Sequence, residues 1–190
     1  LYCDRHDEPR RQATLTVLEH LFECLTAWLA PILCFTAEEA WLTRNPDSSV
    51  HLRVFPDIPE EWQNETLAEK WEMIWQVRRV ITGALEVERG EKRLGSSLQA
   101  APEVYLTQNY ATNLEGVDLA TVGVTSAVSI VEGLVPENAY TLDDVTGGCV
   151  IVQNATGDKC ERCWRILPDV GLESNLPDLC GRCVSVVQSL

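Results

Sequence analysis

The side chains best suited to chemistry are four cysteines near the end of the chain, arranged as two Cys-x-x-Cys pairs. Cys160 pairs with Cys163, Cys180 pairs with Cys183, and 16 residues separate the pairs. Such a turn directs two sulfurs toward one ion, and two turns complete the tetrahedral thiolate set that structural zinc prefers. None of the three histidines lies in this segment. Four thiolates leave no open position, so we predict one structural zinc ion.

Other uses of the paired cysteines remain open at this point. They are two disulfides, a thioredoxin-like redox pair, or iron in a rubredoxin-like site. Four further cysteines occur singly along the chain, and single thiols with paired ones favour a reducing cytoplasm over a disulfide scaffold. Tetrahedral sulfur alone does not separate zinc from iron. A metalloenzyme is disfavoured, because metal catalysis needs a vacant coordination position.

An aromatic residue and three arginines surround the cysteine pairs. Trp164 follows the first pair directly, Arg162 and Arg165 flank it, and Arg182 lies within the second pair. An aromatic ring beside guanidinium groups suits stacking on unpaired bases and contact with phosphates. The alternative is that Trp164 packs over the metal site as a small hydrophobic core.

Composition limits how such an RNA contact is made. The 190 residues carry a net charge of −14, and the segment 157–190 is nearly balanced, with four basic and five acidic residues. RNA contact must therefore be local, because the overall field repels phosphate. The longest apolar run, 24–35, is interrupted by Pro31 and falls short of the ~20 residues of a membrane span. The chain start lacks signal-peptide features, and we expect the chain to be cut from a longer one.

Hydrophobic spacing predicts an α+β protein in which helices come first and strands follow. An apolar stripe predicts a helix over 9–30, and Thr36 with Glu39 forms a capping-box pattern for a second helix. Alternation over 50–54 suggests an extended connector or short strand. The later elements are a long helix over 66–89, a short helix over 109–120, and strands at 104–106, 128–131 and 149–152.

These elements group into three predicted domains. Residues 1–60 form the end of a helical domain, and residues 61–156 form a long helix with a small α+β junction module. Residues 157–190 form a four-cysteine zinc ribbon or knuckle. Because so short a segment buries little core, metal binding is expected to supply its folding free energy.

Four runs of sequence carry a resemblance to a known family. The runs Lys159-Cys-Glu-Arg-Cys-Trp164 and Leu179-Cys-Gly-Arg-Cys-Val184 closely resemble the C-terminal zinc module of bacterial-type isoleucyl-tRNA synthetases. Upstream, the run from Leu29 to Trp41 and the run from Leu94 to Leu98 resemble the anticodon-binding helical domain of the same enzymes. The implied fold is a helical anticodon-binding portion, a small α+β module and a C-terminal zinc ribbon. Residues 107–148 are the least distinctive part.

The resemblance implies a role in translation. The chain would be a non-catalytic, C-terminal part of an aminoacyl-tRNA ligase that recognises the anticodon stem-loop of isoleucine tRNA. An absent catalytic domain, with the HIGH and KMSKS signatures, would use ATP and Mg²⁺ to join isoleucine to its tRNA. The implied partners are isoleucine tRNA and the remainder of the synthetase chain, with no membrane and no DNA, in the cytoplasm.

The resemblance also implies roles for individual residues. The zinc ligands would be the four paired cysteines, and Trp164 would contact the anticodon loop, with Arg162, Arg165 and Arg182 as weaker candidates. Three arginines of the long helix are further candidates for contact with the anticodon stem: Arg78, Arg79 and Arg89. The alternative for these three is that they lie on a solvated helix face. A competing function is a zinc-ribbon protein-interaction module without RNA contact, which buried or acid-paired side chains around the cysteines would favour.

Overall fold

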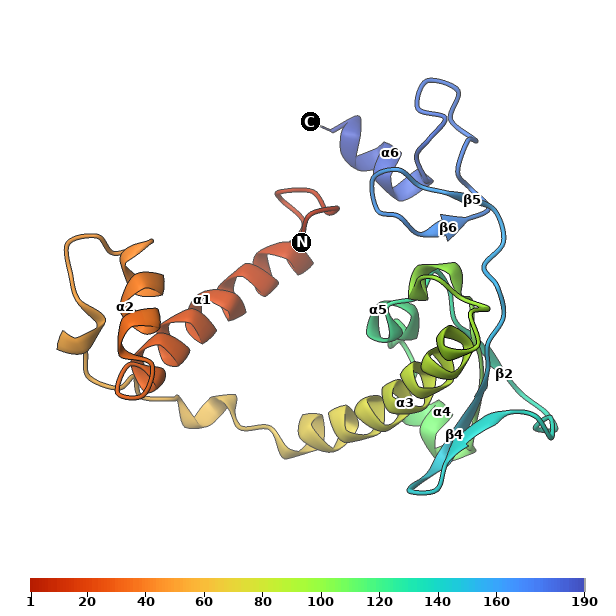
Figure 1. Ribbon diagram of the computed structural model, residues 1–190, viewed down its shortest axis with the longest axis horizontal. Coiled ribbons are helices and arrows are strands. Elements are labelled where there is room, and N and C mark those ends of the chain that lie inside the picture. Colours follow the sequence, from red (N-terminus) through yellow and green to blue (C-terminus); the bar gives the residue numbers. More distant parts are fainter. Residues whose placement is uncertain (190) are drawn as a thin grey trace. The chain divides into compact units, whose positions relative to one another are not determined.

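The computed structural model describes residues 1–189. It divides into two compact units, Leu1–Gln63 and Asn64–Leu190, each of which is treated separately below (Figure 1). Helices and two small sheets give the α+β class that the sequence predicts. Among the described residues, none of the helices combines the length and apolar character needed to cross a membrane.

The first unit is built on two helices, α1 (Pro9–Leu29) and α2 (Cys34–Leu42). The predicted helix over 9–30 is confirmed, with a proline in its first turn, where the missing N–H is not needed. Pro31 ends it as expected. The chain then turns back toward the end of the helix, where the Leu33 amide donates to the carbonyl oxygen of Leu29 at 2.7 Å.

Two local predictions in this unit were wrong. Thr36 does not cap the second helix, because α2 already begins at Cys34. The turn after Pro31 places the chain in helical conformation two residues earlier, and the Ala37 amide donates to the carbonyl oxygen of Leu33 at 2.8 Å. Where the sequence predicts an extended connector or short strand over 50–54, the chain first forms a 3₁₀ turn, η1 (Val50–Leu52), and becomes extended only at Arg53. Glu38 accepts the Val50 amide at 2.8 Å, which holds the turn against α2.

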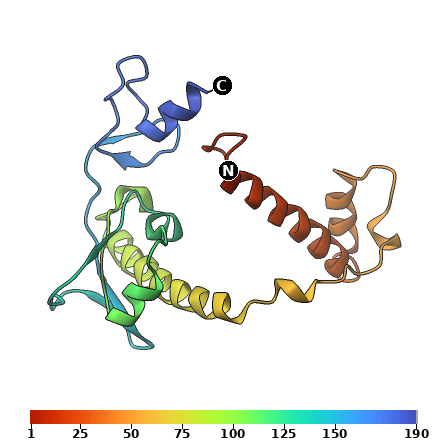
Figure 2. The same cartoon turned by 180° about the vertical axis from the view of Figure 1, so that it is seen from behind.

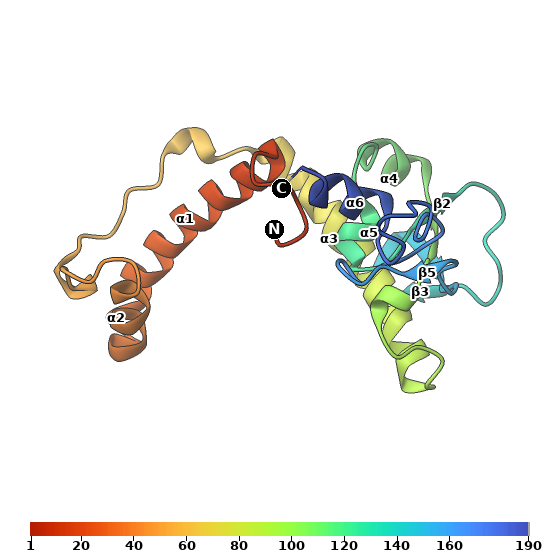
Figure 3. The ribbon, with the colours of Figure 1, turned by 90° about the horizontal axis from the view of Figure 1, so that it is seen from above.

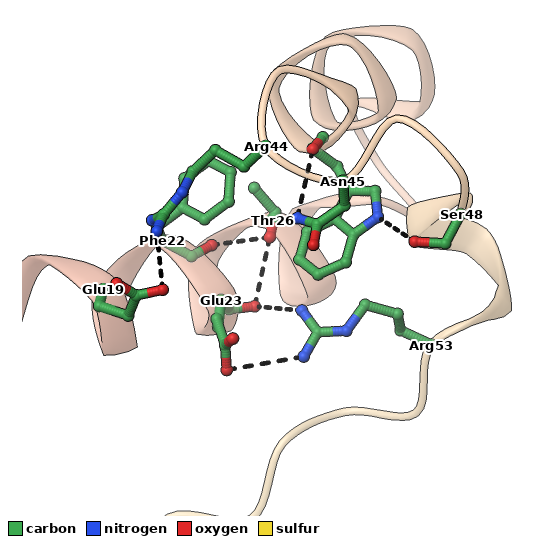
Figure 4. Close-up of polar contacts among 9 residues, drawn as sticks. Glu19, Phe22, Glu23, Thr26, Arg44, Asn45, Ser48 and Arg53 are labelled. Carbon is green, nitrogen blue, oxygen red and sulfur yellow. Dashed lines mark hydrogen bonds and ion pairs between the residues drawn. The ribbon is translucent and has the colours of Figure 1, made fainter.

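Polar and aromatic contacts join α2 and its following loop to α1 (Figure 4). Trp41 is buried, lies parallel to Phe22 at 6.1 Å between ring centroids, and donates to the Ser48 hydroxyl at 3.1 Å. The Arg53 guanidinium lies over the Trp41 ring, 4.3 Å from its centroid, and its Nη2 atom lies 3.8 Å from the Glu23 carboxylate. A 3₁₀ turn, η2 (Glu60–Trp62), precedes the second unit.

The second unit is organised around a long helix, α3 (Glu65–Gly90), as the sequence predicts. Asn64 caps it by accepting the Leu67 amide at 2.9 Å. One face of α3 packs on a sheet and supplies much of the main core (Figure 2). Its fully enclosed members include Val77, Val80 and Ile81.

The sheet has the strand order β2-β1-β4-β3. The strands are β1 (Glu103–Leu106), β2 (Ser129–Val131), β3 (Tyr140–Leu142) and β4 (Val145–Ile151). β1 pairs parallel with β2 and antiparallel with β4, and β4 pairs antiparallel with β3. The three predicted strands are therefore confirmed, and the chain between β2 and β3 runs out as a long loop (Figure 3).

The single helix expected over 109–120 is in fact two. α4 (Gln108–Asn113) and α5 (Leu119–Gly123) are separated by a turn in which Gly116 has a φ of 76°. Glycine adopts this left-handed conformation without steric cost, so it breaks the helix. Asp118 then starts a new helix by accepting the Thr121 amide at 3.1 Å.

The last part of the unit is a two-stranded hairpin followed by a helix. Its elements are β5 (Asp158–Lys159), β6 (Ile166–Leu167) and α6 (Gly181–Val187), with the strands antiparallel. Gly157 begins the hairpin with a φ of 109°, and a Cβ atom there would lie 2.3 Å from the carbonyl oxygen of Leu167. Only glycine allows the two strands to approach so closely.

Candidate functional site

The two Cys-x-x-Cys pairs come together in space. The sulfur atoms of Cys160, Cys163, Cys180 and Cys183 all lie within 4.8 Å of one another. The first pair sits in the β5–β6 turn, while Cys180 is the N-cap of α6 and Cys183 lies in its first turn. Three of the four are buried, and a small apolar shell packs around them: Leu167, Val170 and Leu179. We call this group the four-cysteine cluster.

The cysteines are free thiols rather than disulfides. All eight cysteines lie within the described residues, and none is cross-linked. The sulfur atoms of Cys163 and Cys180 are 3.8 Å apart, far beyond the ~2 Å of a disulfide bond. The disulfide alternative therefore does not describe this arrangement, whereas four convergent sulfurs are the geometry that a tetrahedral metal ion requires.

The surroundings affect the thiols unequally. Burial raises the pKa of Cys183 to about 12. At Cys160 burial acts in the same direction, but backbone amides of Cys163, Cys180 and Arg162 donate to its sulfur and lower the pKa to about 6. Four thiolates so close together repel one another, so a divalent cation at their centre is the group that allows all of them to ionise.

Trp164 lies outside the cluster and faces solvent. Its side chain is 62% exposed, which excludes the small-core alternative. Its backbone is left-handed, with a φ of 66°, and its amide donates to the carbonyl oxygen of Cys160 at 2.8 Å. The Lys159 ammonium lies 5.8 Å from the ring centroid. An exposed indole in a costly backbone conformation is typical of a functional position.

The arginines around the cluster do not share one role. Arg162 donates to the sulfur of Cys183 at 3.8 Å. Arg165 is directed at the protein body, with its Nε donating to the carbonyl oxygen of Ser126 at 3.0 Å. Arg182 is exposed in the first turn of α6. The structure thus brings Arg162 and Arg165 to protein partners instead of gathering all three with Trp164.

The arginines of α3 also have protein partners. Arg78 donates to the carbonyl oxygen of Val122 at 3.2 Å, and Arg79 pairs with Asp144 at 2.8 Å. Arg89 pairs with Glu86 one turn earlier at 2.5 Å. These contacts agree with the solvated-face alternative for Arg79 and Arg89, and contact with RNA stays a prediction for all three arginines.

A cavity of about 330 Å³ opens beside Trp164. We call it the junction pocket, because the 3₁₀ turn η3 (Ser97–Gln99) forms one side and the β5–β6 hairpin forms the other. Its lining residues are Ser96, Leu98, Gln99, Lys159, Trp164 and Ile166. Gln99 and Lys159 line this pocket, and the Ser126 hydroxyl is hydrogen-bonded to Leu98 and Ile166, but none of the three was predicted as a site residue. The visible signal was the capping-box pattern of Ser96 with Gln99.

Comparison with known proteins gives two matching families. The family described as "Anticodon-binding domain of tRNA ligase" matches residues 1–105, which is more than half of the chain. The chain belongs to the anticodon-binding domain family of tRNA ligases. The family described as "Zinc finger found in FPG and IleRS" matches residues 157–186. The four-cysteine cluster of this tRNA-ligase family member is therefore a structural zinc site, and the redox and iron alternatives fall away.

Similar proteins carry the name isoleucine–tRNA ligase. Those of Mesorhizobium japonicum and Bartonella henselae are each 48% identical to this chain, and that of Brucella abortus is 46% identical. Each comparison covers all of this chain and 20% of the relative. The chain thus spans about a fifth of the length of these relatives.

The junction pocket lies between the two regions that match families. The η3 turn belongs to the anticodon-binding match over 1–105, and the β5–β6 hairpin belongs to the zinc-finger match over 157–186.

Proposed function

We propose that this chain is the part of an isoleucine–tRNA ligase that recognises the anticodon stem-loop of isoleucine tRNA. The observation that carries the proposal is the exposed Trp164 on a zinc-held turn, in a chain whose first 105 residues match an anticodon-binding family. The names of the similar proteins support isoleucine as the amino acid. Trp164 would stack on an unpaired base of the anticodon loop.

The proposal assigns a supporting part to the metal. Cys160, Cys163, Cys180 and Cys183 are the proposed ligands, and the zinc they hold would fix the turn that presents Trp164. Four sulfurs fill a tetrahedral ion, so the site supplies position rather than chemistry. The ligation of isoleucine to tRNA, with ATP and Mg²⁺, would belong to a catalytic domain elsewhere in the ligase, acting in the cytoplasm.

The negative net charge of the chain agrees with an RNA contact that involves few phosphate groups. The net charge of −14 means that the overall field of the chain repels RNA phosphates. Lys159 and Arg182 are the exposed cations nearest to the cluster in sequence. Stacking on an aromatic ring is nearly independent of salt, unlike phosphate contact. We therefore propose that Trp164 contributes more to recognition than the arginines do.

Fluorescence anisotropy on the zinc-loaded chain tests the proposal. The probe is a labelled hairpin with the anticodon stem-loop of isoleucine tRNA, and the control hairpin has the same stem with all three anticodon nucleotides replaced. We expect at least tenfold tighter binding of the first hairpin. We also expect the logarithm of affinity to fall with the logarithm of salt by about 0.7 per phosphate contact, with a total slope shallower than about −2. Equal binding of both hairpins, or no binding, contradicts the proposal.

The competing function makes a different prediction for the same measurement. A protein-interaction module would bind neither hairpin, and the Trp164→Ala variant would behave like the parent chain. The commitment of Arg162 and Arg165 to protein partners is the observation in its favour. The match of residues 1–105 to an anticodon-binding family is the reason to prefer RNA.

A further inference from the structure

We infer that Asp169 is a positioning residue for the second half of the zinc site, where it fixes the backbone between Cys180 and Cys183. The Oδ2 atom of Asp169 accepts the amide of Gly181 at 2.9 Å, and Gly181 directly follows Cys180. The inference concerns the four-cysteine cluster alone, so it stands or falls independently of RNA recognition.

The second cysteine pair reaches the cluster from a long irregular segment. Sixteen residues separate Cys163 from Cys180, and after β6 ends at Leu167 the chain runs through turns and bends until α6 begins. Closing so long a segment costs conformational entropy, which metal binding must otherwise supply. The bond between Asp169 and Gly181 joins residues 12 positions apart, near the two ends of this segment. It therefore lowers the part of the closure cost that falls on the ion.

Two other contacts hold the second pair, and both end on sulfur atoms. The Cys180 amide donates to the Cys160 sulfur at 3.4 Å, and Arg162 donates to the Cys183 sulfur at 3.8 Å. The bond of Asp169 differs from these, because it ends on the backbone between the two ligands. It thus sets the direction in which the Cys180 and Cys183 side chains leave the chain, which is how partners around metal ligands usually act.

The glycine within the second pair agrees with this role. Gly181 is the first residue of α6 and does not have a positive φ, so its backbone conformation does not require glycine. A Cβ atom at this position would lie 3.0 Å from the Oδ2 atom of Asp169, closer than side chains normally pack. The missing side chain is therefore explained by the carboxylate that approaches the Gly181 amide.

Charge and positioning predict opposite effects for this carboxylate. Four thiolates around one divalent ion leave a net negative charge, which repels the partly buried Asp169 nearby. If charge alone mattered, removal of the carboxylate would strengthen zinc binding. A carboxylate that accepts a backbone amide makes a strong hydrogen bond, so loss of a positioning bond would weaken zinc binding instead. The sign of the change separates the two roles.

The rate of zinc release from the zinc-loaded, 190-residue chain tests the role, with a chromogenic chelator in excess as the probe. Loss of a partner around metal ligands costs about 10–100-fold in affinity, and Asp169 is partly exposed, so we expect Asp169→Ala to release zinc about fivefold faster or more. Asp169→Asn keeps an oxygen that can accept the Gly181 amide and should stay within about twofold of the parent. Asp178→Ala is the matched control, because it removes an exposed carboxylate two residues before Cys180, and it should also stay within about twofold.

Cobalt substitution adds a readout of the geometry of the site. The visible absorption of bound Co²⁺ depends on tetrahedral coordination by sulfur. At saturating Co²⁺, we expect the parent chain, Asp169→Asn and Asp178→Ala to give the same spectrum. Asp169→Ala should give weaker or shifted bands, because its second cysteine pair is no longer held in place.

Several outcomes would overturn the role of Asp169. They are parent-like or slower zinc release from Asp169→Ala, a parent-like cobalt spectrum of that variant, and an equal loss in Asp178→Ala or in Asp169→Asn. If Asp169→Ala takes up no metal at all, Asp169→Asn decides: normal loading supports the hydrogen bond, and failed loading contradicts it. Binding of the anticodon hairpin is measured separately, so the proposed function is unaffected by either result.

Discussion

The guanidinium of Arg165 donates from Nε to the carbonyl oxygen of Ser126 at 3.0 Å. This bond links two residues that are 39 positions apart. It joins the β5–β6 hairpin, which carries the first cysteine pair, to the loop that precedes β2. Arg165 directly follows Trp164. The residue that anchors the hairpin and the residue that faces solvent are thus neighbours, so the anchor controls where the indole lies.

Removal of the anchor should loosen the hairpin without unfolding it. In Arg165→Leu, the lost hydrogen bond to a charged group is worth about 1.5–3 kcal/mol. We expect the Ile166 amide, which bonds the Ser126 hydroxyl, to exchange with solvent about 10–100 times faster. The Trp164 amide, bonded within the turn to Cys160, is the internal control and should keep its rate. Equal acceleration of both amides, measured by hydrogen exchange, would mean that the turn itself had unfolded.

Metal removal should act on the zinc module alone. The apolar shell around the four-cysteine cluster is small, so the ion supplies most of its folding free energy. After treatment with a chelator, we expect amides of residues 157–186 to lose protection, while those of α3 and β4 keep it. Exchange mass spectrometry with zinc analysis checks this. Protection that persists in the metal-free module is the result that would refute it.

Trp164→Gly should strengthen the turn that it alters. Glycine removes the cost of about 1–2 kcal/mol that a left-handed backbone imposes on other residues, and its greater freedom in the unfolded chain offsets part of that gain. We expect a net stabilisation of about 0.5–1 kcal/mol, seen as slower zinc loss to a chelator. Trp164→Ala is the matched control, because it removes the ring but keeps the strain. Faster zinc loss from the glycine variant than from the alanine variant would contradict the reasoning.

Gly157→Ala should be the more harmful of two glycine substitutions in the module. At Gly171, which has a φ of 87°, an added methyl group would have its nearest neighbour 3.4 Å away, so alanine there meets only the backbone cost of about 1 kcal/mol. At Gly157 the added methyl would also lie 2.3 Å from Leu167 O. We expect at least about twice the loss of unfolding free energy at Gly157. Urea titration of the zinc-loaded variants measures both losses of unfolding free energy. Equal losses would contradict the prediction and show that the hairpin backbone moves to accept the methyl group.

The sequence predicted best the features that depend on near neighbours. The long helix α3 follows from repeated apolar spacing, and the four-cysteine cluster follows from two short motifs that each aim a sulfur pair. Thr36 misled because the turn after Pro31 had already set the helix register. The junction pocket had one local signal, the capping-box pattern of Ser96 with Gln99, and this pattern does not show that the β5–β6 hairpin packs beside that turn. The pocket depends on Ser126, whose partners Leu98 and Ile166 lie 28 and 40 residues away.

The hydrogen bond from Arg162 to the sulfur of Cys183 has a consequence for the electrostatics of the zinc module. Four thiolates outweigh the charge of one divalent ion, so the filled site is an anion embedded in a chain that is already acidic. The Arg162 guanidinium, which lies against the Cys183 sulfur, offsets part of this excess negative charge directly at the metal site. Under the proposed function, the zinc module would then present Trp164 to RNA without the full repulsion of its own metal centre.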